Sequence, residues 1–151
     1  MKTLSSTHDL ASIRGRLARL TPEDARQWGS MTVAQMICHL TDSFGCPLDE
    51  RPVPPFKASP IPVPIYKWLA LNFPKKWPPG VPTPPVMDQQ IGGTPPGEFV
   101  ADHATLLAKL DQFVHSSGPW GSHPIFGDMT TAEWMRWGYL HTDHHLRQFG
   151  R

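Results

Sequence analysis

Residues 47–96 constrain the fold of this chain most strongly, because they contain fifteen of its eighteen prolines. Proline lacks a backbone donor and clashes with the preceding helical turn, so this segment cannot be mostly helical, although its centre, IYKWLALNF, can form a short helix. It also has five aromatic residues, which a disordered linker would not need: Phe56, Tyr66, Trp68, Phe73 and Trp77. We therefore expect an ordered strap that shields the core, with a substrate lid and a dimer surface as alternatives.

Two segments before the strap have apolar residues at three- and four-residue spacing, which is typical of amphipathic helices. The first helix is expected over residues 10–20 and should end before Pro22, because the residue before a proline avoids the helical region. The second is expected over residues 32–44, with Ser30 or Thr32 as its N-cap.

Two further helices are expected after the strap. The third begins near Glu98 and ends at residues 116–119, where SSGP is a strong stop signal. The fourth begins at Thr130, at capping-box spacing from Glu133, and continues to Phe149. No segment alternates apolar and polar residues as a strand does. The sequence therefore predicts an all-α fold, a four-helix bundle with a long proline-rich connection between helices two and three.

Composition narrows the class of protein. A chain of 151 residues with 39% apolar residues is expected to form one domain over residues 1–151. Its net charge of +1 and the lack of a lysine and arginine cluster argue against a nucleic-acid partner. The N-terminus has no apolar signal region, and the stretch PIPVPIYKWLALNF is too short to span a bilayer. Cys38 and Cys46 are spaced too far apart on one helix for a disulfide, so we expect free thiols and a cytoplasmic protein without membrane contact.

The stretch YLHTDHHLRQ, residues 139–148, is the strongest chemical signal in the sequence. His141 and His145 are four residues apart, so they project from the same side of a helix. They continue the apolar stripe that Trp134 and Trp137 begin. Burying two imidazoles without partners would cost about 1 to 3 kcal/mol for each group. We therefore expect either a metal ion or dedicated hydrogen bonds at this pair.

A metal site needs a third ligand, and the best candidate is His39 on the flank of the second helix. Three neutral histidines leave a coordination position open, which is the catalytic pattern for zinc and similar ions. Asp143 is expected to point outward, whereas His144 lies close enough to the pair to replace His145 as a ligand. The alternative is a histidine-rich helix end that the helix dipole favours when protonated.

The other histidines are less informative. His103 is in step with the apolar face of the third helix, where a lone histidine is usually a hydrogen-bonded core residue. His8 and His115 lie near expected helix ends and should be solvated. His123, in SHPIFGD, either shapes the turn before the fourth helix or borders the site.

The sequence resembles the DinB/YfiT-like superfamily of metal-dependent four-helix bundles, which carry one histidine on the second helix and an H-x-x-x-H pair on the last. The corresponding residues are His39 in MICHL and His141 and His145 in HTDHHLRQ. Over nearly its whole length the chain resembles an uncharacterised branch of this superfamily. The segments that carry this resemblance are WGSMTVAQMICHLTDSFG, the PTPP region, GEFVADHATLLAKL and HPIFGDMTTAEWMRWGYLHTDHHLRQFG. The common ending H-H-R-G-Q is replaced by HHLRQ, which keeps the ligand spacing.

This resemblance implies a divalent ion, zinc or nickel, bound by the three histidines. It also implies a small-molecule substrate, because related families include transferases and isomerases that use low-molecular-weight thiols. The leading hypothesis is a hydrolase or thiol-dependent transferase, although a shared fold does not transfer a reaction. No nucleophile or general base stands out, and the residues that could orient the ligands or the substrate are Asp42, His144, Arg147 and Gln148. The alternatives are a non-catalytic metal-binding or protein-interaction module, and a homodimer formed through the strap.

Overall fold

The computed structural model describes residues 1–73, 76–80 and 83–151, and the elements in this part of the chain are helical. In chain order they are α1 (Thr7–Leu17), α2 (Val33–Gly45), α3 (Val63–Asn72), the 3₁₀ helix η1 (Pro85–Met87), α4 (Phe99–His115) and α5 (Thr131–Gln148). The predicted all-α helical bundle is confirmed. Among the described residues the one β feature is an isolated bridge between His123 and Gly127.

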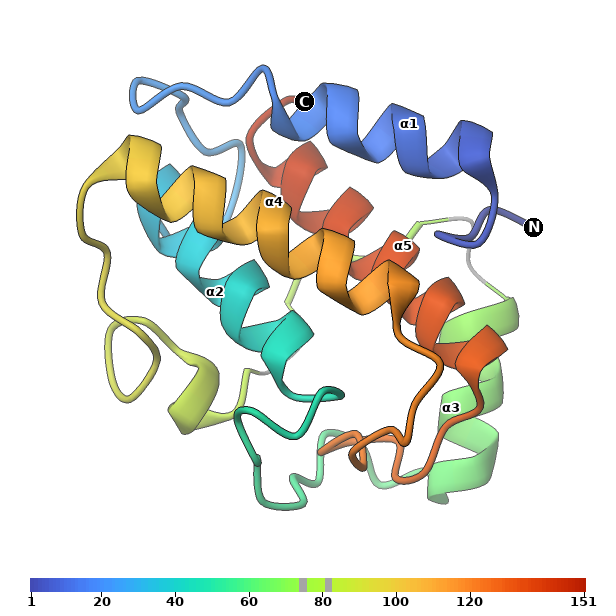
Figure 1. The fold of residues 1–151 in the computed structure, drawn as a ribbon. Coiled ribbons are helices and arrows are strands. Elements are labelled where there is room, and N and C mark those ends of the chain that lie inside the picture. The colour runs from blue at the N-terminus through green and yellow to red at the C-terminus, as the bar shows by residue number, and fades with distance from the viewer. Residues whose placement is uncertain (74–75, 81–82) are drawn as a thin grey trace.

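Four helices make the bundle and two belong to the strap. Helix α2 packs along α4, and α1 packs along α5, while α3 lies against the N-terminal half of α5 (Figure 1). Helix α3 begins two residues before the IYKWLALNF stretch (residues 65–73), for which a short helix was expected, and covers all of it except Phe73. Within the described ranges, no helix is both long and apolar enough to cross a membrane.

Local capping explains where the bundle helices begin. Thr32, not Ser30, caps α2 in a capping box with Gln35, and Thr130 forms the same motif with Glu133 at the start of α5. The expected end of the first helix is wrong by three residues, since α1 stops at Leu17. Leu20 is nevertheless buried, because a turn after the helix returns its side chain to the core.

The strap is held to the bundle by side chains. The Asp42 carboxylate on α2 accepts hydrogen bonds from Arg51 Nη1 at 3.0 Å, from Gln89 Nε2 at 2.9 Å and from both the amide and the hydroxyl of Thr94, at 2.9 and 2.7 Å. In the middle of the strap, near the C-terminal end of α3, Leu71 O accepts a hydrogen bond from Arg136 Nε of α5 at 2.9 Å. Side chains thus replace the backbone ladder that a proline-rich segment cannot form.

Glycine lets α5 approach the rest of the core at one position. A Cβ atom on Gly138 would lie 2.7 Å from Leu4 Cδ1 and 3.0 Å from Phe113 Cε1. These neighbours are packed side chains of the core, so they have little room to move. By contrast, a Cβ atom on Gly15 of α1 would meet no atom within 4 Å.

We expect Gly138→Ala to lower the free energy of unfolding by about 1 to 3 kcal/mol, because it overpacks the core. The matched change Gly15→Ala should raise the free energy of unfolding by about 0.5 to 1 kcal/mol, since alanine is the better residue in an open helix position. Urea denaturation of both variants measures this difference. Equal effects of the two substitutions would contradict the packing described for α5.

Candidate metal centre and cavity

Three imidazoles from α2 and α5 converge at one point in the bundle. His39 Nε2 lies 3.2 Å from His141 Nε2, and His145 Nε2 lies 3.1 Å from the same atom. All three potential ligand atoms lie within 4.8 Å of one another. The structure therefore brings together the three predicted ligands, although His39 is about a hundred residues from the other two in the chain.

Hydrogen bonds on the outer nitrogens fix two of these rings. His39 Nδ1 donates to Met87 O at 2.8 Å, and His145 Nδ1 donates to Gln148 Oε1 at 3.0 Å. The orientation of the Gln148 amide is set in turn by its Nε2, which donates to Trp28 O at 2.9 Å. Both rings therefore carry hydrogen on Nδ1 and present an Nε2 lone pair to the centre.

The centre lacks enough hydrogen atoms to pair its nitrogens. In its neutral form His141 has at most one Nε2 hydrogen to offer to two facing lone pairs. A cation between the rings would satisfy all three, and nitrogens at tetrahedral positions around zinc are about 3.3 Å apart, close to the two observed separations. Within the described part of the chain two buried side-chain nitrogens have no partner, and one of them, His141 Nδ1, belongs to this centre. The donor set therefore fits a divalent metal ion.

Burial also keeps the histidines in the protonation state that binds metal. Loss of solvent lowers the pKa of His39, and its hydrogen bond to Met87 O opposes this effect only in part. The pKa values of His141 and His145 lie well below 6.5, first because of burial and then because neighbouring imidazoles repel a second positive charge. All three rings are thus neutral at neutral pH, as metal ligands must be.

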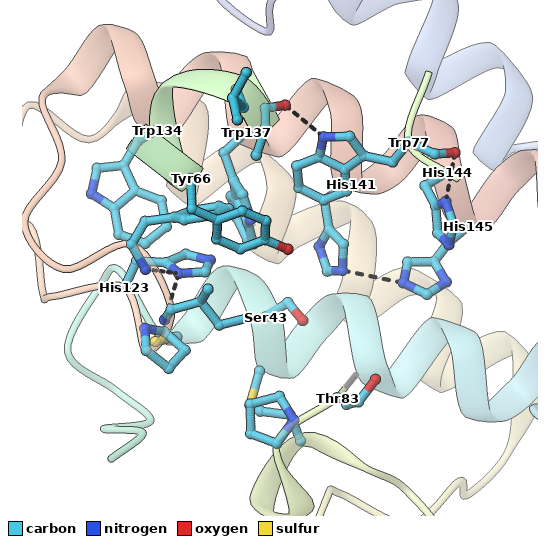
Figure 2. Close-up of a pocket in the computed structure, with 18 of the residues that line it drawn as sticks. Ser43, Tyr66, Trp77, Thr83, His123, Trp134, Trp137, His141, His144 and His145 are labelled. Carbon is cyan, nitrogen blue, oxygen red and sulfur yellow. Dashed lines mark hydrogen bonds between the residues drawn. The ribbon is translucent and has the colours of Figure 1, made fainter. Parts of the chain in front are cut away.

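The triad opens onto a cavity of about 440 Å³ that the strap and α5 enclose (Figure 2). Tyr66, Leu69 and Trp77 of the strap line one side, and Trp134 and Trp137 of α5 line another. Among the described residues, the lining contains no carboxylate, lysine or arginine. The cavity is therefore an apolar chamber with polar groups at a few points, which is typical of a small-molecule site.

Of the four residues proposed to orient the ligands, Gln148 is the one that hydrogen-bonds a triad histidine. His144 lines the cavity, its ring lies against His145, and its Nδ1 lies 3.4 Å from Trp77 O. Arg147 Nη2 donates to the same carbonyl at 3.2 Å, so it supports the strap beside the site. Asp42 hydrogen-bonds strap residues and no atom of the triad.

Asp143 differs from the sequence expectation that it points outward. Its carboxylate is buried between α1 and α5, where it accepts from Arg16 Nη1 at 2.7 Å and Arg147 Nε at 2.9 Å. The expectation was wrong because helical phase places Asp143 away from the metal ligands but cannot show that α1 covers that side. Asp143 joins two helices and takes no part in the cavity.

The two cysteines are free thiols, as predicted, and neither supplies a nucleophile. Burial raises the pKa of Cys46, which lines the cavity, to about 11. Burial and the nearby Asp102 carboxylate raise the pKa of Cys38 to about 12. Both thiols stay protonated at neutral pH and behave as small apolar groups.

The remaining histidines occupy distinct environments. His103 donates from Nε2 to Leu17 O at 2.9 Å and stacks on Phe99, so it is the hydrogen-bonded packing residue that was expected. His8 and His115 are exposed, also as expected. His123 does both things between which the sequence could not choose: it closes the turn before α5 and it lines the cavity.

Sequence reasoning missed the strap groups that complete the site. Met87 O and Trp77 O hold His39, His144 and Arg147 through backbone oxygens, which any residue type could supply. Their positions depend on the path of a proline-rich segment without helical or strand periodicity. The aromatic residues of the strap were the one signal that this segment has an ordered role.

Comparison with known proteins gives one match. A family model described as "Protein of unknown function (DUF1569)" matches residues 2–151. No curated protein and no solved structure matches the chain. The match covers nearly the whole sequence, the triad and the strap included, and its description assigns no reaction. Function must therefore be argued from the geometry of the site.

Stability should fall when the pH drops below neutral, and His123 should account for part of this loss. Burial lowers the pKa of His123 to about 3, below the value of about 6.5 in the unfolded chain. The contribution of neutral His123 to the free energy of unfolding is therefore fully present above pH 6.5. It decreases by about 1.4 kcal/mol for each pH unit as the pH falls from 6.5 toward 3.

We expect His123→Asn to reduce the loss of unfolding free energy between pH 7.5 and pH 5 by about 2 kcal/mol relative to the wild type. Urea denaturation at both pH values measures this difference. Equal slopes for wild type and His123→Asn would contradict a buried neutral His123.

Proposed function

The chain belongs to this family of proteins of unknown function, and from that premise we propose that it is a DinB-like metal-dependent enzyme acting on a small molecule. In this proposal His39, His141 and His145 bind one divalent ion. The observation that carries it is the convergence of three Nε2 atoms, two of them on rings whose Nδ1 hydrogens are already committed to oxygen acceptors. Hydrogen bonds alone leave this arrangement incompletely paired.

We propose zinc or nickel on the family resemblance, since a donor set of three imidazoles by itself also suits copper and iron. Imidazole nitrogen suits both ions, and the protonated thiols of Cys38 and Cys46 leave an all-nitrogen site without soft thiolate ligands. Three protein ligands leave at least one coordination position for another molecule. Because the triad residues line the cavity, that position would be reached from the apolar chamber.

When bound, such an ion supplies Lewis acidity, which polarises a carbonyl or lowers the pKa of a coordinated water or thiol. No carboxylate among the described lining residues can serve as a general base, and the buried cysteines remain protonated. We therefore favour a nucleophile from outside the protein that ionises at the ion without the help of a carboxylate. A thiol, with a pKa of about 8.5, meets this condition more easily than water, so a thiol-dependent transfer is favoured over hydrolysis.

A non-catalytic binding module is the second candidate, favoured by the apolar outer surface of the strap. Trp68 is 58% exposed and Ile65 is 54% exposed, and neither side chain lines the cavity. In such a module the metal would stabilise the bundle and these side chains would contact another protein. Removal of the metal would then lower the melting temperature of a protein that catalyses no turnover.

The first test measures metal binding by protein purified without a histidine tag. We expect about one zinc or nickel ion for each chain in the wild type, and loss of stoichiometric metal in His141→Ala and His145→Ala. His115→Ala is the matched control, because His115 is an exposed histidine at the C-terminal end of α4 and is not one of the three ligands, so this variant should retain the metal.

Gln148→Leu should weaken metal binding without removing a ligand. It keeps all three ligands but removes the acceptor for His145 Nδ1, so metal affinity should fall about 10- to 100-fold without being abolished. Competition with a chelator measures the affinity. Stoichiometric metal that persists in both alanine variants would contradict the assigned ligands.

The second test measures turnover. Metal-loaded protein is supplied with a panel of low-molecular-weight thiols and neutral electrophiles, with consumption of free thiol as the readout. We expect a metal-dependent rate that His141→Ala reduces by at least two orders of magnitude, since loss of Lewis acidity removes several kcal/mol of transition-state stabilisation. Metal-independent consumption, or full activity in His141→Ala, would exclude this chemistry.

A further inference from the structure

The cavity has a second polar position besides the triad, formed by His123. This ring is 7% exposed and lies against three aromatic rings, with centroids 4.6 Å from Phe126, 5.4 Å from Trp134 and 5.4 Å from Trp137. It is contributed by the turn between α4 and α5, and thus by a different part of the chain from the triad histidines.

The turn fixes where the hydrogen of His123 lies. Nδ1 accepts from two backbone amides, Ile125 N at 3.1 Å and Phe126 N at 3.2 Å. A nitrogen that accepts from two donors cannot itself carry hydrogen, so the neutral ring must carry its hydrogen on Nε2. The buried, apolar surroundings keep the ring neutral. His123 is therefore a fixed N–H donor and cannot exchange the roles of its nitrogens.

This donor has no acceptor within the described part of the protein. Figure 2 shows the ring of His123 among the residues that line the cavity, with the two turn amides bonded to one side of it, and Nε2 lies at the other side of the ring. Nε2 is accessible from the cavity, since the fully buried unpaired side-chain atoms of the described residues are Gln89 Oε1, Trp134 Nε1 and His141 Nδ1. A molecule in the cavity that offers an acceptor oxygen would give this donor a partner.

The surroundings also define the charge of that molecule. His123 is neutral, its ring neighbours are aromatic, and no charged side chain of the described residues lines the chamber. A carboxylate or phosphate would lose its hydration there without gaining a counter-charge at this position. A carbonyl oxygen needs one donor and carries no net charge, so it matches His123.

We propose that His123 Nε2 binds the carbonyl oxygen of an uncharged, largely apolar substrate whose reacting end lies at the His39, His141 and His145 triad. The two positions are separated by one side chain, since the Trp137 ring lies 5.4 Å from His123 and stacks on His141 at 4.9 Å. A small aromatic or aliphatic ketone, ester or amide can bridge such a separation. This assignment deepens the proposed function, on which it rests only in treating the cavity as the substrate site.

Binding of two matched probes to metal-free protein tests the proposal without requiring turnover. Acetophenone and ethylbenzene have nearly the same shape, but acetophenone alone has a carbonyl. Titrations followed by the indole N–H signal of Trp137, which lines the cavity, should show acetophenone binding about three- to tenfold more tightly, the value of one neutral hydrogen bond.

His123→Asn provides the critical variant, because its side-chain oxygen can still accept from the turn amides while the donor at the Nε2 position is lost. The preference for acetophenone should disappear in His123→Asn and persist in His141→Ala. If instead it disappears in His141→Ala and persists in His123→Asn, the carbonyl binds at the triad and this inference is wrong, although the metal proposal stands.

Two other results would also overturn the inference. One is an absence of preference in the wild type, including failure of both probes to bind. The other is a long-range ¹H–¹⁵N spectrum that shows hydrogen on Nδ1 of His123. Neither result depends on metal binding or catalysis, so failure here is distinguishable from failure of the proposed enzyme function.

Discussion

The carboxylate of Asp42 determines how the strap lies on the bundle, and the site depends on that placement. A proline-rich segment has few backbone donors and cannot fold onto the core through a ladder of its own hydrogen bonds. Asp42 takes their place, because it accepts from Arg51 near the start of the strap and from Gln89 and Thr94 near its end. Arg51 then donates onward to Val86 O and Gly92 O. One buried carboxylate thus holds two parts of the strap that are distant in sequence beside η1 through hydrogen bonds.

The same placement puts strap carbonyls where the histidines need them. Met87, at the end of η1, is the acceptor that orients His39, and Trp77 O lies beside His144 and Arg147. Strap side chains meanwhile form a wall of the chamber into which the triad opens. The segment that looked least regular in the sequence therefore supplies both the support of the ligands and part of the binding surface.

Local sequence patterns were sufficient to predict the four helices of the bundle. The starts of α2 and α5 follow from the capping boxes at Thr32 and Thr130, and the triad follows from helical phase at His141 and His145 once His39 is chosen as the third ligand. The pairing of Asp143 with Arg16 could not be found in this way, because it depends on which helix packs beside α5. The sequence left open whether His123 shapes the turn or borders the site, since its burial arises from tertiary contacts with Trp134 and Trp137.

The hydrogen bond between His39 and Met87 O also makes the strap and the ligand set thermodynamically linked. An ion on Nε2 of His39 would strengthen the bond from Nδ1, and the docked strap would in turn hold the ring in the orientation that binds the ion. Thermodynamic linkage requires that the ion stabilises the docked strap by the same free energy by which the docked strap stabilises ion binding. The resistance of the strap to proteolysis would then report on metal occupancy, and the retention of metal would report on whether the chamber is closed.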